Sequence, residues 1–354
     1  MSKKIRVALL FGGRSAEHEV SVRSAAAIRR NLAEDRFDVL SIYITPEGLW
    51  RPVAEPVPGP AKLATGPAFP FLPWSLRSLP GPLAADIYFP VLHGPFGEDG
   101  TIQGLLEVAG VPYVGAGVPG SALGMDKALA KSVFRERKIP VVPHMVVREK
   151  DWAADRRGVL AAVETRFETP FFVKPANLGS SVGITKVKNR REAPAALKEA
   201  FRYDAKALVE KGIAGRELEC SVLGNEDPEA SLPGELIPSR EFYDYADKYE
   251  LGRTSLIMPA RLPAAVTAKV RRLAVAAFLA LEVRGMARVD FFLERRTGRL
   301  YVNELNTIPG FTEISMFPKL WEVSGLPFPR LLERLIELGF ERHLGRKVCL
   351  SRKA

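Results

Sequence analysis

Two strand-like segments near the C-terminal end, joined by a short polar turn, constrain the fold of this chain most strongly. Residues 286–293 and 300–306 are rich in apolar residues, and the segment 294–299 between them has the composition of a turn. Pairing the two strands across this turn brings Asp290 opposite Glu304. Opposite Cβ atoms in a hairpin lie only about 4.5–5.5 Å apart, so the sequence predicts two carboxylates in close contact.

The same register, centred on Thr297, brings Arg288 opposite Asn306 on the same face, because side chains two residues apart share a face of a strand. Two carboxylates and an amide then crowd together, and directly opposed like charges destabilise a sheet. A cation relieves this repulsion, and oxygen-only ligands suit Mg²⁺, which proteins usually share with substrate phosphates. A solvated acidic face without a metal is the competing interpretation, but apolar strands favour a buried hairpin.

Length and composition restrict the class of protein. The 354 residues are enough for two or three domains with a sizeable core. No segment is long and apolar enough to span a bilayer, and the N-terminus lacks a signal-peptide core and a cleavage site, so we expect no membrane partner. The two cysteines, Cys220 and Cys349, form neither a disulfide framework nor a metal motif, which favours a reducing cytoplasm.

The net charge of +10 does not by itself predict a nucleic-acid partner. Lys and Arg are scattered along the chain, without a long basic block or a recognisable nucleic-acid motif. A basic cleft for a polyanionic nucleotide is equally compatible with this charge. We therefore expect no nucleic acid among the partners.

Alternating apolar runs and helical patterns predict an α/β protein whose N-terminal part is a doubly wound parallel sheet. Its strands are expected at 5–10, 38–44 and 86–92, with a helix at 22–32. Ligands gather at the carboxyl ends of parallel strands, which is where Gly12, Gly13 and the loop 93–100 fall. The Pro- and Gly-rich stretch 51–82 predicts an irregular surface insertion rather than a domain.

The remaining chain divides into a central segment, 126–215, and a C-terminal segment, 216–354, so that the first domain covers 1–125. The central segment is expected to hold helices at 126–138 and 193–201 and strands at 141–147, 171–174, 184–187 and 207–210. The C-terminal segment is expected to hold a strand at 217–223, a polar Tyr-rich stretch at 239–254, a helix at 265–281, the hairpin, and a helix at 327–342.

Lys174 ends a predicted strand and is followed by the Gly- and Ser-rich loop 176–183. Backbone N–H groups and one ammonium in such a loop can hold phosphates, although a plain β-hairpin fits the pattern as well. The loop is not a Walker loop, because the GxxxxGK[ST] spacing is absent. At the end of a later strand, Glu210 can accept from ribose hydroxyls while the backbone at 211–213 reads adenine. An ordinary strand end is the alternative interpretation.

These motifs, in this order, resemble the ATP-grasp superfamily and, within it, the D-alanine:D-alanine ligase family. The resemblance runs from the N-terminus to about residue 340. The motifs that carry it are FGGRSAEHEVS at 11–21, LHG at 92–94, GEDG at 97–100, MDK at 125–127, VKP at 173–175, GSSVG at 179–183, FYDY at 242–245, KY at 248–249, NELNT at 303–307 and PGFT at 309–312. It implies three α/β domains, with ATP held between the central and C-terminal domains.

The resemblance also implies how ATP and metal are bound. Lys127 and Lys174 contact the ATP phosphates, and Ser181 of the glycine-rich loop joins the nucleotide contacts. The ribose and adenine side is held by Glu210, Lys211, Ile213 and Glu217. Asp290, Glu304 and Asn306 bind two Mg²⁺ ions, or Mn²⁺ in their place. Metals and lysines together neutralise charge on the phosphoryl group as it moves.

For the amino-acid substrates, the resemblance implies two subsites. Glu17 meets the ammonium of the first D-alanine and is hydrogen-bonded with Ser180 and Tyr249, which closes a loop over the site. His93 contacts the carboxyl group of the same substrate. The second D-alanine carboxylate is bound by Lys248 and Ser315. Arg288 and the backbone N–H of Gly310 form the oxyanion hole.

The implied reaction makes D-alanyl-D-alanine for peptidoglycan synthesis in a bacterial cytoplasm, by a homodimer. A relative that joins D-alanine to D-lactate is an alternative, but Tyr249 argues against it, because such relatives carry Phe there or have a different loop. A nucleotide-binding protein that has lost catalysis is another, and the intact Arg288, Asp290 and Glu304 argue against it. A dehydrogenase is excluded because no GxGxxG follows the first strand. Glu313 and Ile314, which vary among relatives and lie near the second substrate, leave the preference for that substrate slightly open.

Overall fold

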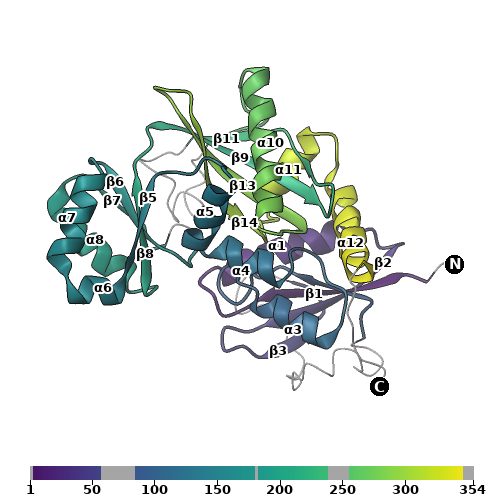
Figure 1. The fold of residues 1–354 in the computed structure, drawn as a ribbon. Helices are drawn as coiled ribbons and strands as arrows, with labels where there is room; N and C mark the ends of the chain where they lie inside the picture. Colours follow the sequence, from purple (N-terminus) through teal and green to yellow (C-terminus); the bar gives the residue numbers. More distant parts are fainter. Residues whose placement is uncertain (1–2, 57–83, 180–181, 238–254, 346–354) are drawn as a thin grey trace, which may run out of the picture.

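The structure is a computed structural model that describes residues 3–56, 84–179, 182–237 and 255–345. It confirms an α/β protein, and its strands form three sheets, one in each of the three successive parts of the chain (Figure 1). The central sheet and its helices stand at one end of the molecule in this view, and the first and third sheets lie next to each other at the other.

The first sheet has the strand order β3-β2-β1-β4. Its strands are β1 (Ile5–Gly12), β2 (Phe37–Ile44), β3 (Trp50–Val53) and β4 (Ile87–Pro90). As predicted, β1 pairs in parallel with both β2 and β4. The edge strand β3 is antiparallel and lies inside a stretch expected to be irregular, which its position allows because Pro52 is tolerated at a sheet edge. Residues 57–82 of that insertion lie outside the described residues.

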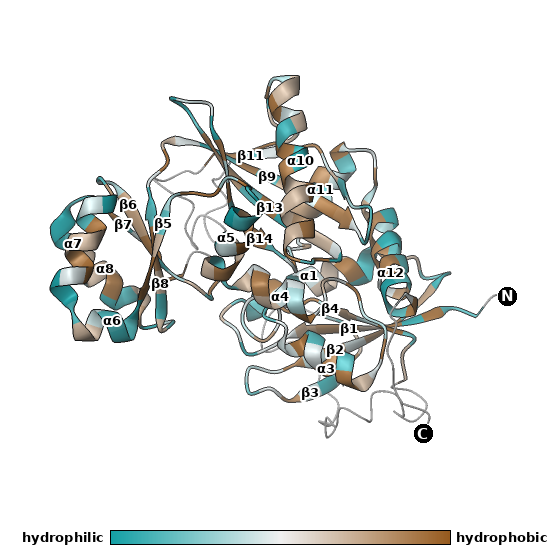
Figure 2. Cartoon of the chain, in the orientation of Figure 1, coloured by the Kyte–Doolittle hydropathy of each residue, from teal (hydrophilic) through white to brown (hydrophobic). Residues whose placement is uncertain are grey.

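Alternation along β1 explains how both faces of this sheet are covered. Val7, Leu9 and Phe11 pack with helices α1 (His18–Asn31) and α12 (Phe328–Leu344) on one face. Ala8 and Leu10 pack with helix α3 (Thr101–Ala109) on the other face. Strands buried on both faces read as continuous apolar runs, and these strands are brown along much of their length in Figure 2. The last helix of the described chain therefore completes the core of the first sheet.

The central sheet is antiparallel, with the order β5-β8-β6-β7. Its strands are β5 (His144–Arg148), β6 (Phe171–Pro175), β7 (Thr185–Val187) and β8 (Lys206–Lys211). The helices α6 (Glu149–Ala154), α7 (Arg156–Arg166) and α8 (Ala193–Ala200) pack with it around a core that includes Trp152, Phe171 and Leu197, and a 3-10 turn, η2 (Arg190–Glu192), precedes α8.

The third sheet has the order β12-β11-β9-β13-β14, with β10 paired to β9. Its strands are β9 (Gly215–Gly224), β10 (Glu229–Ala230), β11 (Gly234–Ile237), β12 (Ser255–Ile257), β13 (Gly285–Glu294) and β14 (Leu300–Asn306). Helices α5 (Lys127–Glu136) and α10 (Ala264–Ala280) share one core with this sheet. Helices α4 (Val118–Met125) and α11 (Met316–Val323) complete its surroundings.

Helix α5 therefore packs on the third sheet, although it opens the segment predicted to form the central domain. Its Ala130 and Phe134 belong to the same core as Phe278 of α10 and Val289 of β13. The division at residues 125 and 215 stays a prediction.

The hairpin of β13 and β14 has the predicted register where the polar residues lie. Asp290 pairs with Glu304, and Arg288 pairs with Asn306. A β-bulge directly after Asp290 shifts the remaining pairs by one residue, so Leu293 pairs with Leu300 near the turn.

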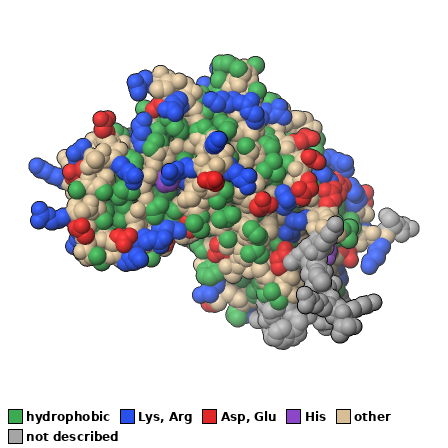
Figure 3. All heavy atoms as spheres, in the orientation of Figure 1, with side chains coloured by type: hydrophobic (Ala, Val, Ile, Leu, Met, Phe, Trp, Pro, Cys, Tyr) green, Lys and Arg blue, Asp and Glu red, His purple; other side chains and the backbone are tan. Residues whose placement is uncertain are grey.

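On the face in Figure 3, Lys and Arg side chains lie over several parts of the described surface, and Asp and Glu side chains lie among them. None of the described helices combines the length and the apolar character needed to cross a membrane.

Candidate active site

The polar end of the β13–β14 hairpin is organised around Arg288. Its Nε donates to Asp290 Oδ1 at 2.7 Å, and its Nη2 donates to Asp290 Oδ2 at 2.8 Å. On the neighbouring strand β9, Glu219 pairs with Asp290 in the sheet and lies 3.0 Å from Arg288 Nε. Burial opposes the charged guanidinium, but these two carboxylates outweigh it and raise the pKa of Arg288. Arg288 therefore remains a cation held between two acidic side chains.

The residues expected to bind metal lie together on this face. Asp290 and Glu304 are opposite each other, and Asn306 Nδ2 donates to Asp290 Oδ2 at 3.1 Å. Among the described residues, no three His, Cys, Asp or Glu side chains are grouped as a metal site of their own. Two carboxylates and one amide are nevertheless oxygen donors of the kind that Mg²⁺ uses when phosphates complete its ligand set. The donor set at the hairpin therefore fits a Mg²⁺ ion shared with a nucleotide.

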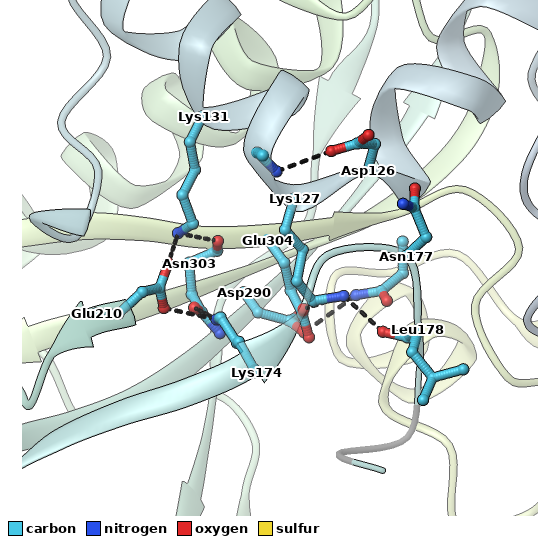
Figure 4. A network of polar contacts seen from close by, with 12 residues as sticks. Asp126, Lys127, Lys131, Lys174, Asn177, Leu178, Glu210, Asp290, Asn303 and Glu304 are labelled. Carbon is cyan, nitrogen blue, oxygen red and sulfur yellow. Dashed lines mark hydrogen bonds and ion pairs between the residues drawn. The ribbon is translucent and has the colours of Figure 1, made fainter. Parts of the chain in front are cut away.

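Lysines from two other elements approach these carboxylates (Figure 4). Lys127, the first residue of α5, lies with Nζ 3.3 Å from Glu304 Oε2 and donates to the carbonyl oxygen of Leu178 at 2.7 Å. Asp126 caps this helix by accepting from the N–H groups of Ala128 and Leu129, and it also pairs with Lys206 of β8. The helix N-terminus and its first lysine are thus fixed between the central and third sheets.

Lys174 lies at the end of β6 and is bound on the same side of the site. Its Nζ lies 2.6 Å from Glu210 Oε2 and donates to Asn303 Oδ1 at 3.3 Å. The second oxygen of Glu210 lies 2.9 Å from Nζ of Lys131, which is one helical turn after Lys127. Burial works to raise the pKa of Glu210, but the two ammonium groups outweigh it and hold that pKa at about 2. Glu210 is therefore an anion that joins two lysines.

Glu17, expected to meet a substrate ammonium, lies between two glycines. A Cβ atom added to Gly94 would come 2.6 Å from Glu17 Oε2, and one added to Gly179 would come 2.8 Å from the same oxygen. Gly94 also has a φ of 74°, which disfavours any residue with a side chain. The two glycine-containing loops can therefore approach this carboxylate only because they lack side chains there.

His93 ties the first sheet to the loop that follows β14. Its Nδ1 lies 3.0 Å from the carbonyl oxygen of Ile308, and its Nε2 lies 3.1 Å from Ser24 Oγ. Ser24 Oγ in turn accepts from the N–H of Phe311 at 3.2 Å. Burial lowers the pKa of His93, which favours the neutral ring.

Glu98 forms a second connection between the loop after β4 and the loop after β14. Its two carboxyl oxygens accept from the N–H of Gly94 at 3.0 Å and from the N–H of Ile308 at 3.3 Å. Burial raises its pKa to about 8, with the charge of Glu17 acting in the same direction. His93 and Glu98 thus hold the loop of Ile308 and Gly310 against the first sheet.

These groups surround a small cavity of about 100 Å³. It is lined by residues from the first sheet, the third sheet and the connecting loops, including Glu17, His93, Glu98, Gly179, Glu219, Arg288, Glu304, Asn306, Gly310 and Ser315. The volume is well below the roughly 300–1,000 Å³ typical of drug-sized ligand pockets, so it suits a molecule of a few heavy atoms with charged ends.

The other predicted site residues line this cavity, lie on β8, β9 and the loop between them, or fall outside the described residues. Ser315 Oγ accepts from the N–H of Thr312 at 3.0 Å, and a Cβ added to Gly310 would come 2.6 Å from it, so the two residues are adjacent. Lys211 and Glu217 lie on β8 and β9, and Ile213 lies in the loop between these strands. Ser180, Ser181, Lys248 and Tyr249 lie outside the described residues.

Four residues of the site were not predicted as site residues: Lys131, Glu219, Asn303 and Glu98. Glu219 had a visible signal, since it lies two residues after Glu217 and therefore on the same face of its strand. Lys131 had one too, since it follows Lys127 at helical spacing. The spacing alone did not show that either residue belongs to the site, because that depends on how strands distant in sequence pair and pack.

Two family descriptions match the chain. The family described as D-ala D-ala ligase N-terminus matches residues 6–116, and the one described as D-ala D-ala ligase C-terminus matches residues 133–337. Among similar curated proteins, the D-alanine–D-alanine ligase of Solibacter usitatus is 52% identical over 98% of each chain. The D-alanine–D-alanine ligase of Geobacillus kaustophilus is 46% identical over 96% of each chain.

Solved structures of the same kind superpose over almost the whole chain. The D-alanine-D-alanine ligase from Coxiella burnetii is 38% identical, with a TM-score of 0.82 over 97% of this chain and 96% of its own. The VanG D-Ala:D-Ser ligase from Enterococcus faecalis is 35% identical, with a TM-score of 0.83 over 95% of this chain and 100% of its own.

Proposed function

This chain belongs to the D-alanine–D-alanine ligase family, and on that basis we propose that it joins two D-alanine molecules with ATP to give D-alanyl-D-alanine, ADP and phosphate. The product serves peptidoglycan synthesis. The observation that carries the proposal is the small cavity in which Glu17, His93, Arg288 and the loop of Gly310 meet beside the carboxylates of Asp290 and Glu304.

In the first step, the carboxylate of one D-alanine attacks the γ-phosphorus of ATP, the bond to the β-γ bridging oxygen breaks, and ADP leaves. The product is an acyl phosphate, which turns a poor leaving oxygen into a good one. Glu17, between Gly94 and Gly179, accepts from the ammonium of this D-alanine, and His93 orients its carboxyl group. Lys127 and Lys174 neutralise charge on the phosphates.

In the second step, the neutral amine of another D-alanine attacks the acyl carbon, and phosphate leaves with the electron pair of the broken C–O bond and takes up the proton that the nitrogen loses. The negative charge that develops on the carbonyl oxygen needs donors that are already in place. Arg288, fixed by Asp290 and Glu219, and the N–H of Gly310, in the loop held by His93 and Glu98, supply them. Ser315 and Lys248 bind the carboxylate of the second D-alanine.

Asp290, Glu304 and Asn306 would hold Mg²⁺, two ions in our proposal, and the metal would offset negative charge on the nucleotide phosphates. The nucleotide lies between the central and third sheets, with Glu210, Lys211, Ile213 and Glu217 on its ribose and adenine side. Ser181 joins the phosphate contacts, and Ser180 and Tyr249 join Glu17. The enzyme works as a homodimer in the cytoplasm, which light scattering and cell fractionation can test.

The decisive experiment measures phosphate release from MgATP with D-alanine, L-alanine, D-alanine plus D-lactate, and D-alanine plus D-serine, with each product identified by mass. D-serine is included because one similar solved structure is titled a D-Ala:D-Ser ligase. Release with D-alanine alone, matched by D-alanyl-D-alanine, supports the proposal. Dominant formation of a D-lactate ester or a D-serine dipeptide overturns the choice of second substrate, and no release with any of them overturns the reaction.

A further inference from the structure

Lys131 is a buried lysine that the proposed reaction does not use. It lies on α5 one turn after Lys127, and its side chain is only 1% exposed. Its Nζ lies 2.9 Å from Glu210 Oε1 on the central sheet and donates to the carbonyl oxygen of Asn303 on the third sheet at 2.7 Å. One ammonium group therefore joins three elements, α5, β8 and β14.

A lysine so deeply buried needs strong partners. Burial lowers the pKa of Lys131 to about 8, while the carboxylate of Glu210 acts in the opposite direction. An apolar side chain would fill the same space without the cost of desolvating a charge. The two partners are placed at the site, so the position of Lys131 suggests a role there rather than in packing alone.

Glu210 contacts Lys174 as well as Lys131. Its Oε2 lies 2.6 Å from Lys174 Nζ, so the order of contacts is Lys131, Glu210, Lys174 (Figure 4). Lys174 also donates to the side chain of Asn303, whose carbonyl oxygen is bound by Lys131. Both lysines thus fix Asn303, the residue directly before Glu304 on β14.

The charges in this group do not cancel. Two ammonium groups face one carboxylate, all buried, which leaves a net positive charge among the three side chains. Lys127, in contact with Glu304, lies beside them in Figure 4. The excess is confined to the group Lys131, Glu210 and Lys174, because the carboxylates of Asp290 and Glu304 lie next to it, and a nucleotide phosphate beside Lys174 would balance it.

We propose that Lys131 is a positioning residue for nucleotide binding: it holds Glu210 and Asn303 in place, and through Glu210 it directs the ammonium of Lys174 toward the phosphates. The inference rests on the proposed function, which puts ATP phosphates at Lys127 and Lys174. It assigns Lys131 no contact with the reacting atoms. Loss of the Lys131 side chain is therefore expected to weaken nucleotide binding and to leave D-alanine binding almost unchanged.

The test compares Lys131→Met with Lys269→Met, a matched change on the exposed face of α10. ADP affinity is measured by calorimetry without D-alanine, and the KM values for ATP and D-alanine are measured separately. We expect Lys131→Met to weaken ADP binding and raise the KM for ATP by about tenfold, with the KM for D-alanine changed by less than about twofold. Lys269→Met is expected to change none of these.

A double-mutant cycle with Glu210→Gln tests the route of the effect. If Lys131 acts through Glu210, Lys131→Met added to Glu210→Gln weakens ADP binding by less than about twofold further. Lys131→Gln, which keeps a donor for Asn303, replaces Lys131→Met in the cycle if the methionine variant does not fold. Unchanged ADP affinity in a folded Lys131 variant, or full additivity in the cycle, overturns the inference.

The two proposals fail in different ways. If the wild-type protein binds ADP but makes no D-alanyl-D-alanine, the proposed reaction is wrong, and the ADP titrations still decide the role of Lys131. If product forms and the Lys131 variants bind ADP as the wild type does, only the role of Lys131 is wrong.

Discussion

Arg288 and Asp290, two residues apart on β13, meet in a two-pronged ion pair, with contacts of 2.7 and 2.8 Å. The pair connects the two halves of the proposed chemistry, because Asp290 is a proposed metal ligand and Arg288 a proposed oxyanion donor. A change in the position of one is transmitted to the other. Phosphoryl transfer and peptide-bond formation are thus expected to share one rigid strand.

Arg288→Ala is expected to lower kcat by about 10²–10³, the usual effect of losing one oxyanion donor. Arg288→Lys is expected to lower kcat as well, because an ammonium cannot form the two-pronged contact with Asp290. Steady-state kinetics and circular dichroism of both variants are the measurements. Arg334→Ala, at a half-buried arginine of α12 that pairs with Glu341 away from the site, is the control and should leave kcat unchanged. Near-wild-type turnover of either Arg288 variant contradicts the assignment.

Glu304→Gln is expected to raise the Mg²⁺ concentration needed for half-maximal activity by at least about tenfold, since even partners beyond the ligand shell contribute that much to metal affinity. The change keeps the shape of the side chain but removes the charge that faces Asp290 and Lys127. Activity is measured across a Mg²⁺ titration at saturating ATP. Glu322→Gln, exposed on α11, is the control and should show the Mg²⁺ dependence of the wild type. If Glu304→Gln shows the same Mg²⁺ dependence, the proposed metal site is wrong.

Gly94→Ala is expected to reduce kcat/KM for D-alanine by about tenfold or more, because a displacement of about 1 Å near a reacting group can cost about 10² in rate. The added Cβ would lie 2.6 Å from Glu17 Oε2. Gly325→Ala is the matched control, since Gly325 also has a positive φ, 97°, but has open space around it. It should lose stability without losing kcat/KM. Equal kinetic effects at the two positions would show that strain alone, and not Glu17, accounts for the loss.

Glu98 predicts a dependence of stability on pH. Burial raises its folded pKa to about 8 from an ordinary value near 4.5, so between these pH values the folded protein binds a proton that the unfolded chain has released. This contribution to stability is complete below about pH 4.5 and is lost as the pH rises through 8. Glu98→Gln is expected to reduce the fall of the Tm between pH 5 and pH 8, by about 2 °C for each kcal/mol removed.

The Tm is measured for wild type and Glu98→Gln at several pH values, with Glu322→Gln as the control for an exposed glutamate. Parallel Tm curves for wild type and Glu98→Gln would mean that Glu98 is ionised in the folded protein. The tie between Gly94 and Ile308 would then be made by a carboxylate rather than by a carboxylic acid.

Local pairing could be predicted from the sequence, and the hairpin shows how far. The pairs Asp290–Glu304 and Arg288–Asn306 follow from symmetry about Thr297. The bulge after Asp290 could not be predicted, because the shift toward the turn depends on backbone geometry rather than on side-chain type. The error falls on the apolar half of the hairpin, so the polar face was predicted correctly.

Structure that depends on distant contacts was missed. Helix α4 contains Gly120 and Gly124, which are poor helix formers, so no helix was predicted there. Its glycines are explained only by the packing: a Cβ added to Gly120 would come 3.0 Å from the backbone at Val283. The roles of Lys131 and Glu219 were missed for the same reason, since each depends on a strand far away in sequence.

The position of α12 has a consequence for how the protein is made. Phe11 and Phe89 of the first sheet share their core with Leu331 and Leu335 of the last described helix. On the ribosome, the first sheet emerges long before this helix, so its apolar face waits uncovered while the rest of the chain is synthesised. We therefore expect the N-terminal part to reach its final packing only after release of the full chain, and a protein shortened before α12 to depend on chaperones.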